Sequence, residues 1–335
     1  MKDQKGTQTP SRLSKIDPRN LLGIIAAFAA RTSTAGTGYV ESIMIAHMDT
    51  FVLAGTESLF GGILLLIILP LGKLHFFERL LVRLRGSQDV ERSSGQLPNP
   101  DRLVKFAIVV IGLTILAIFT KQMALMALKA GFSSGSLGAC LAVGPLTLSV
   151  YQGFRDGRPG RAFGAALIAF AGVALVTGFV SLSGLNLPLG GALFALLAAG
   201  SRGLAIPLSR RPIDRSQGNL ANTCSTLASA IVLLIWARFI SHSDLSPLGD
   251  ATTCLAIFGV SVISTVIPQL ADLLARILIL DKDRTYAIIY SSGPMISVLI
   301  SVAGHQALTW MQFLGIVSLS IAVLISQLGR KTQAR

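Results

Sequence analysis

Two stretches of the sequence decide its predicted fold: GPLTLSVYQGFRDGRPGRAFGAALIAFAGVAL at residues 144–175 and GPMISVLISVAGHQALTWMQFLGIVSLSIAVL at residues 293–324. Each stretch begins with Gly-Pro, continues through a polar turn and ends in an apolar helix that contains glycine. The offset is 149 residues between Gly144 and Gly293, and 151 residues between Gly164 and Gly315. This near-constant offset predicts that the chain contains an internal repeat.

Working outward from these stretches, the chain contains ten apolar runs long enough to span a bilayer as helices. They lie at approximately 20–40, 51–71, 104–126, 133–153, 162–181, 188–208, 219–240, 252–272, 285–303 and 309–327. Because each half would hold an odd number of spans, the halves would lie in opposite orientations in the membrane. The sequence therefore predicts an all-α integral membrane protein with ten transmembrane helices in two inverted five-helix repeats, 20–181 and 188–327.

Composition supports a membrane protein and excludes a soluble enzyme. Of the 335 residues, 52% are hydrophobic and 13% are charged, and the mean hydropathy is +0.66. A net charge of +13 would suggest a nucleic-acid partner in a soluble protein, but here we attribute it to membrane topology and expect no nucleic acid. Cys140, Cys224 and Cys254 lie singly in apolar stretches, so we predict no disulfide framework, metal site or cofactor.

The positions of the basic residues predict the orientation. Apart from Arg31, Lys121 and Arg202 inside predicted spans, and with Lys105 counted at the edge of its span, 24 of 26 Lys and Arg residues lie in the two termini and in alternate connections, which share one side of the membrane. The opposite connections hold Lys129 and Arg238. Cytoplasmic loops collect Lys and Arg, so we expect a multi-pass inner-membrane protein with both terminal segments, 1–19 and 328–335, in the cytoplasm and no cleaved signal peptide. The cytoplasmic loop at 73–103 is interpreted as a flexible linker.

The ten-helix plan and its last two helices in each half resemble the EamA family of the drug/metabolite transporter superfamily. Ser264-Thr265, Pro268-Gln269 and the stretch RTYAIIYSSGPMISVLISVAGHQALTWMQFLGIVSLSIAVLIS look like the threonine and homoserine exporter branch. The chain departs from the family where Gly304-His305 and Gly157-Arg158 replace a common Gly-Glu. The resemblance implies an inner-membrane carrier that exports amino acids or related metabolites, in exchange for protons, and it supplies no residue role to transfer.

Arg31 and Arg202 are the leading candidates for substrate binding. They occupy matching positions in the first helix of each half, where Gly, Ser and Thr interrupt the apolar pattern in RTSTAGTG and GSRG. Paired interruptions of this kind indicate the central site of a transporter, and a guanidinium binds a carboxylate through two parallel hydrogen bonds. The alternative is that each arginine extends to a membrane interface or binds a loop carbonyl. Asn222 and Thr226 rank below them, either as lining of the same cavity or as hydrogen-bonding partners of neighbouring helices.

Glu57, in LAGTESLFGG, is the candidate for coupling, at a position where related exporters tend to carry a basic residue. A carboxylate in a low-dielectric wall favours its acid form, so it would exchange a proton against substrate. It would equally serve as a static partner of Arg31 or Arg202, or lie at an interface. If Glu57 pairs with the arginines, the substrate carboxylate would compete with Glu57 for them.

Further polar and helix-bending residues are candidates for the cavity or a gate. Lys121 either adds positive charge to the cavity or extends outward to the membrane surface, and of these we favour the outward orientation. The Gly-Pro pairs either shape the cavity or are ordinary kinks. This group consists of Lys121, Gly144, Pro145, Gln269, Gly293 and Pro294. Glu41, His47 and Asp49 lie near a short outer connection and match no metal-binding motif.

The sequence therefore predicts a secondary transporter, not an enzyme. It would export threonine-like or homoserine-like amino acids, or related carboxylates, by alternating access with proton coupling, as a monomer or a homodimer. The alternatives are a carrier of drugs, nucleotide sugars or lipid-linked cargo, and a membrane enzyme or non-transporting subunit. An enzyme of lipid intermediates would cluster Asp, His or Glu at one membrane face, whereas these residues are scattered in the sequence.

Overall fold

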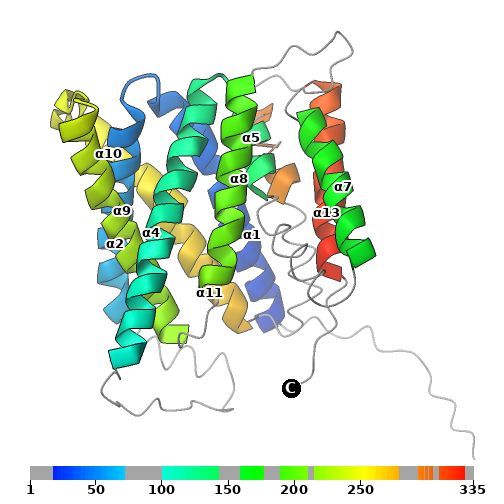
Figure 1. The fold of residues 1–335 in the computed structure, drawn as a ribbon, viewed down its shortest axis with the longest axis horizontal. Helices are drawn as coiled ribbons and strands as arrows, with labels where there is room; N and C mark the ends of the chain where they lie inside the picture. Colours follow the sequence, from blue (N-terminus) through cyan, green and yellow to red (C-terminus); the bar gives the residue numbers. More distant parts are fainter. Residues whose placement is uncertain are drawn as a thin grey trace, which may run out of the picture.

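A computed structural model describes the main helical body of the protein. The described residues are 18–71, 100–142, 159–176, 189–209, 215–278, 293–297, 299–300, 302–304 and 309–328. Within these ranges the chain is mainly helical and contains no strand, which confirms the predicted all-α class. The helices stand side by side with their axes roughly aligned (Figure 1).

The first half of the chain contributes four long helices and one short helix to the described residues. They are α1 (Pro18–Met44), α2 (Thr50–Leu71), α4 (Pro100–Lys129), α5 (Ser134–Ala142) and α7 (Pro159–Val176). The predicted spans at 20–40, 51–71 and 104–126 therefore coincide with helices, and the span at 162–181 coincides with α7 up to Val176, with its remainder outside the described residues. The predicted span at 133–153 is described as a helix over α5, and its remainder lies outside the described residues.

The second half contains two π-helical turns among its helices. It consists of α8 (Leu189–Ser209), α9 (Arg215–Ile235), the π turn η1 (Trp236–Ile240), the 3-10 turn η2 (Ser246–Gly249), α10 (Ala251–Ser261), the π turn η3 (Val262–Val266), α11 (Ile267–Leu278) and α13 (Trp310–Leu328). The segments α10, η3 and α11 form one continuous helical run over the predicted span at 252–272. Part of the predicted span at 285–303 is described, and it is helical at 293–297.

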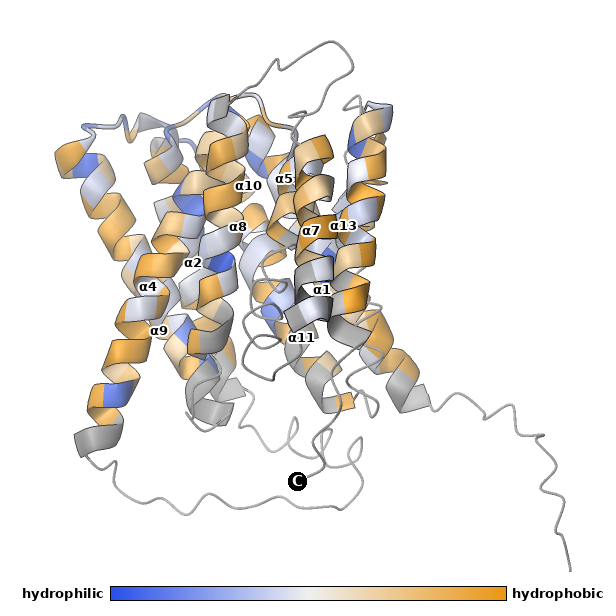
Figure 2. Ribbon diagram, turned by 45° about the vertical axis from the view of Figure 1, so that its right-hand side comes forward, coloured by the Kyte–Doolittle hydropathy of each residue, from blue (hydrophilic) through white to orange (hydrophobic). Residues whose placement is uncertain are grey.

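Four described helical segments are long and apolar enough to cross a membrane: 50–68, 103–129, 219–240 and 251–271. Shorter apolar helices lie at 164–176, 190–205 and 310–322. On α4, Ile108, Ile111 and Ile115 are 56%, 60% and 61% exposed and share one helix face. Such a stripe would be unfavourable in water but suits contact with lipid chains. Figure 2 shows apolar residues on the outward faces of the helices. These features fit a membrane protein.

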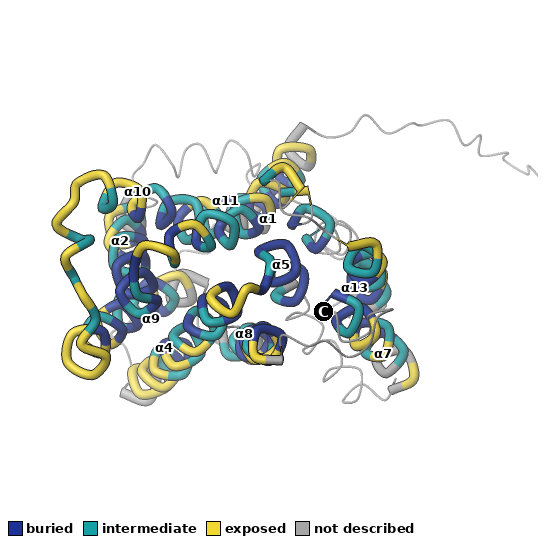
Figure 3. Tube along the Cα trace, turned by 90° about the horizontal axis from the view of Figure 1, so that it is seen from above, coloured by how far each residue is buried: buried dark blue, intermediate teal, exposed yellow. Residues whose placement is uncertain are grey.

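The helices pack as pairs that join the two halves of the chain. The closest pairings are α1 with α11, α2 with α9, α4 with α8, and α7 with α13. The short helix α5 touches α1, α8 and α13 and lies among them when the molecule is seen from above (Figure 3). A continuous apolar core of buried Leu, Ile, Val and Ala side chains includes Leu53, Leu125, Leu233, Ile257 and Ile316.

Two glycines bring one of these helix pairs, α7 and α13, into close backbone contact. A Cβ atom added at Gly172 of α7 would lie 2.8 Å from the carbonyl oxygen of Gly315 in α13. One added at Gly315 would lie 2.6 Å from the carbonyl oxygen of Gly172. Small residues of this kind allow transmembrane helices to approach closely without side chains between them. The two glycines therefore set the spacing of α7 and α13.

Candidate functional site

A cavity of about 380 Å³ with apolar walls and several polar and charged groups lies among helices of both halves. It is lined by residues of α1, α2, α4 and α5 from the first half, and of α8, α9, η3 and α11 from the second. Binding sites for small molecules commonly enclose roughly 300–1,000 Å³ and combine apolar walls with a few polar groups. The cavity therefore has the size and composition of a site for a small polar molecule.

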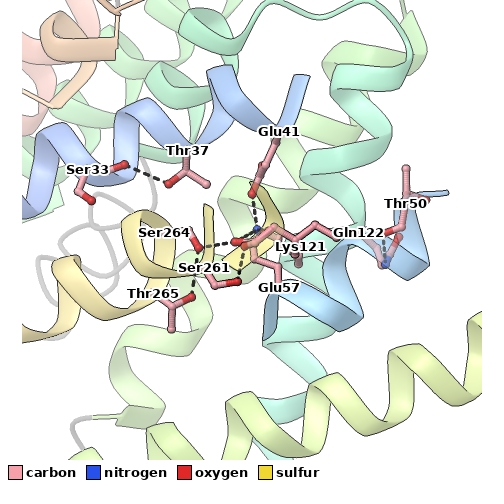
Figure 4. Close-up of polar contacts among 11 residues, drawn as sticks. Ser33, Thr37, Glu41, Thr50, Glu57, Lys121, Gln122, Ser261, Ser264 and Thr265 are labelled. Carbon is pink, nitrogen blue, oxygen red and sulfur yellow. Dashed lines mark hydrogen bonds and ion pairs between the residues drawn. The ribbon is translucent and has the colours of Figure 1, made fainter. Parts of the chain in front are cut away.

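An ion-pair cluster of Glu41, Glu57 and Lys121 forms one wall of the cavity (Figure 4). The Lys121 ammonium donates hydrogen bonds to Glu41 and Glu57. Its Nζ atom lies 2.8 Å from each carboxylate oxygen of Glu57. Glu41 and Glu57 are 4% and 2% exposed, and the Lys121 side chain is 23% exposed. Three helices, α1, α2 and α4, thus each contribute one charged side chain to a buried cluster.

The π turn η3 adds a fourth group to this cluster. The Ser264 hydroxyl donates a hydrogen bond to the Glu57 carboxylate and lies 3.2 Å from the Thr265 hydroxyl. The carbonyl of the preceding residue, Ile263, accepts a hydrogen bond from Ser33 of α1. A π turn contains one residue more than an α-helical turn, and such turns occur frequently at functional sites. The turn η3 therefore ties the acidic cluster to both α1 and α2.

The close approach of η3 to α2 depends on a glycine. A Cβ atom added at Gly61 would lie 2.9 Å from the Thr265 side chain. Gly61 is one helical turn beyond Glu57, on the same side of α2. The missing side chain lets η3 lie against α2, which brings Ser264 within hydrogen-bonding distance of Glu57.

Four further predicted site residues line the cavity: Arg202 on α8, Asn222 and Thr226 on α9, and Gln269 on α11. The Thr226 hydroxyl donates to the backbone carbonyl of Asn222 at 2.9 Å, as a helical threonine commonly does. Next to Arg202, the Ser201 hydroxyl lies 2.7 Å from the Thr120 hydroxyl of α4. The structure thus brings these residues to the same cavity as Glu57 and Lys121.

Other predicted site residues lie elsewhere. Arg31 is half-buried on α1 and is not among the described residues that line the cavity. Gly293 and Pro294 begin a described helical stretch, in which the Gly293 carbonyl accepts a hydrogen bond from Ser297 at 3.1 Å, and neither is among the described lining residues. Gly144 and Pro145 lie outside the described residues. Of the two arginines, Arg202 is therefore among the described residues that line the cavity and Arg31 is not.

The expected outward orientation of Lys121 is wrong. Its ammonium group lies between two buried carboxylates, because an ion pair within the protein satisfies the charge without contact with the membrane surface. Glu57 forms an ion pair within the protein, as the alternative of a static partner predicts. The structure gives Lys121 as this partner, in place of the predicted Arg31 or Arg202.

Glu41 is the functional candidate that sequence reasoning missed. Ending the first span near residue 40 placed Glu41 in a connection, whereas α1 continues to Met44. Glu41 therefore lies within the last helical turn, where its side chain meets α4. The signal that would have found it is charge complementarity, because Glu41 and Lys121 fall near the ends of α1 and α4 that adjoin the same side of the predicted membrane.

Among the described residues, no group of three or more His, Cys, Asp or Glu side chains is arranged to hold a metal ion. Cys140 is buried, and Cys224 and Cys254 are partly buried free thiols.

Comparison with known proteins supports the fold and gives no identity. No family model matches the chain, and no curated protein matches it. A solved structure described only as a crystal structure of a protein matches with a TM-score of 0.55 and 18% sequence identity. The match covers 93% of this chain and 97% of the other. At this identity the similarity concerns the helical fold alone, and it extends over almost the whole of both chains.

Proposed function

We propose that this protein is a secondary transporter of the EamA type. It exports small threonine-like or homoserine-like amino acids, or related carboxylates, across the inner membrane, and a proton gradient drives the export. The observation that carries the proposal is the cavity between helices of both halves, which holds ionisable side chains among apolar walls. Intramembrane charges are costly unless they serve a pathway or a binding site. The substrate carboxylate would bind Arg202, and Glu57 would couple transport to protons.

The helix pairings support an inverted repeat of five helices in each half. In such a repeat, α1 corresponds to α8, α2 to α9, the α10–α11 run to α4, and α13 to α7. Exchanging the halves then converts the pairing of α1 with α11 into the pairing of α8 with α4. The pairs α2 with α9 and α7 with α13 map onto themselves. All four observed pairings agree with this exchange, which is the symmetry that alternating access about a central site uses.

The test is uptake of labelled amino acids into inverted membrane vesicles with an imposed proton gradient. The panel includes threonine, homoserine and simple carboxylates, and vesicles without the protein serve as the background. Accumulation that depends on the gradient is expected for at least one amino acid. No accumulation above background across the panel would reject the proposal and direct the search to drugs, nucleotide sugars or lipid-linked cargo.

Arginine variants locate the carboxylate site in the same assay. Arg202→Ala removes a charged donor from the cavity and is expected to reduce uptake about tenfold or more, as loss of a charged hydrogen bond does. Arg238→Ala is the matched control, because Arg238 is exposed in η1 and outside the described cavity lining. Since Arg31 is not on that lining, Arg31→Ala should reduce uptake less than Arg202→Ala. Equal uptake by the Arg202 and Arg238 variants would place the carboxylate elsewhere.

A further inference from the structure

The cluster of Glu41, Glu57 and Lys121 contains more negative than positive groups. Two carboxylates share one ammonium, and the fourth member, Ser264, is neutral. With all three ionisable groups charged, the cluster has one negative charge in excess. Both carboxylates are almost completely buried. An uncompensated charge in such a setting is strongly destabilising, so the cluster favours binding of one further positive charge.

The surroundings of the cluster offer hydrogen bonds and one other charge. Among the described lining residues, Arg202 is the remaining ionisable group, and it enters from α8, which packs against α4 and α5. The elements α5, α9, η3 and α11 contribute neutral polar side chains: Ser134, Asn222, Ser225, Thr226, Ser229, Ser264, Thr265 and Gln269. The cation that the structure pairs with both carboxylates is Lys121.

One buried oxygen of the cluster is in ion-pair contact with Lys121 but accepts no hydrogen bond from the described residues. Glu57 Oε2 lies 2.8 Å from the Lys121 nitrogen, but outside hydrogen-bonding geometry, and it accepts no hydrogen bond from the described residues. Glu57 also lines the cavity. Buried carboxylate oxygens normally accept at least one hydrogen bond. An acceptor of this kind, beside an excess negative charge and an open cavity, is a site for a cationic hydrogen-bond donor.

We propose that Glu41, Glu57 and Lys121 form a binding site for one additional cationic group, which is either a proton or the ammonium group of a substrate. Glu41 creates this requirement, because Glu57 and Lys121 without it would form a neutral pair. The two ligands exclude each other: when an ammonium group binds, a cluster carboxyl releases its proton to water and the resulting carboxylate accepts the ammonium hydrogen bonds. The ammonium part of this inference rests on the proposed transport function.

The first arm of the test detects the proton without any substrate. Infrared spectroscopy of the purified protein records the carbonyl band of a protonated carboxyl group. The wild type is expected to show this band, and Glu41→Gln is expected to lose it because the cluster becomes neutral. Glu41→Asp and the exposed control Asp244→Asn should retain it. Absence of the band in the wild type, or its persistence in both Glu41→Gln and Glu57→Gln, would overturn the proton site.

The second arm measures protons released when threonine is added, with a pH-sensitive dye in weak buffer. Linkage requires release of about one proton for each threonine bound by the wild type and none for Glu41→Gln. The matching 2-hydroxy acid lacks the ammonium group and should cause no release. Threonine binding without proton release in the wild type would overturn the inferred competition. An infrared band without threonine binding would instead reject the proposed amino-acid substrate and leave the cation site standing.

Discussion

At the scale of single residues, Lys121 is the cation that keeps two buried carboxylates compatible with the folded state. Lys121→Met would preserve the apolar stem and remove the charge, leaving both carboxylates without their ion pair. Breaking a buried pair in this way costs about 3–5 kcal/mol. We expect a clear drop in the thermal unfolding midpoint of the purified protein, measured by intrinsic fluorescence.

The matched control for this substitution lies on the same helix. Lys105 is exposed, so Lys105→Met removes an equal charge from α4 without disturbing a buried cluster and should leave the midpoint nearly unchanged. If the Lys121 and Lys105 variants unfold at the same temperature, Lys121 does not stabilise the folded protein through the cluster.

The candidate site was predictable from the sequence where a charged residue stands inside an apolar run. Glu57 and Arg202 were identified by this criterion and both line the cavity. The ion pairs of Lys121 with Glu57 and Glu41 were not predictable. These residues are 64 and 80 positions apart in the sequence, and no local spacing specifies contacts over such separations. The direction of Arg31 depends on the rotation of α1 about its axis, which tertiary packing determines.

At the scale of secondary-structure elements, the start of α10 depends on Asp250. Its carboxylate accepts hydrogen bonds from the Thr253 hydroxyl at 2.7 Å and from the backbone amides of Thr253 and Thr252. These bonds lower the pKa of Asp250 from its ordinary value of 3.8, with the Thr253 hydroxyl as the largest cause. The folded state thus favours the carboxylate over the acid, as an N-cap does.

The expected result is a pH-dependent contribution to stability. Because the folded pKa is below the unfolded one, the contribution is fully present above the unfolded value and is lost as the pH falls through the folded value. Asp250→Ala should therefore lower the unfolding midpoint at neutral pH, and the difference from wild type should shrink in strong acid. Asp250→Asn, which still caps the helix but does not titrate, should lower the midpoint less than Asp250→Ala at neutral pH, and its difference from wild type should change with pH in the same direction. A constant difference at every pH for Asp250→Ala would contradict this account.

The contact between α7 and α13 gives a matched pair of glycine variants on one helix. Gly172→Ala places a methyl group 2.8 Å from a backbone carbonyl of α13, whereas Gly164→Ala meets no atom within 4 Å. Overpacking of this kind costs about 1–3 kcal/mol. Gly172→Ala should lower the unfolding midpoint, and Gly164→Ala should leave it unchanged or raise it slightly because alanine favours helix. Equal effects would show that the close approach is not required for stability.

The helices themselves were largely predictable, because long apolar runs in a chain with few charges favour helical spans. The predicted run at 219–240 ends where η1 ends, and the run at 252–272 falls within α10, η3 and α11. The π turns were not predictable, since their residues have ordinary helical character and the extra residue is accommodated by packing. Boundaries at polar residues were also missed, as at Glu41, because a buried ion pair allows helix to continue through a charge.

At the scale of the whole molecule, the distribution of basic residues predicts which side of the membrane each connection faces. The connection between η1 and α10 is exposed at Ser241 and should face outward. In a protein whose three cysteines are replaced by serine, Ser241→Cys should react with an impermeant maleimide in right-side-out vesicles. Arg335→Cys should react in inverted vesicles. The reverse pattern would contradict the predicted orientation of the chain in the membrane.

The π turn between α10 and α11 acts on the chain as a one-residue insertion does. Each residue of an α-helix advances the side chains by about 100° around the axis, so the two ends of this helical run are out of phase with a regular helix. Deleting one residue from Val262–Val266 would restore regular winding and swing either Ser264 or Gln269 away from the cavity. The length of the chain between these residues is therefore as much a determinant of the site as their chemical identity, and alanine substitutions within the turn would not reveal it.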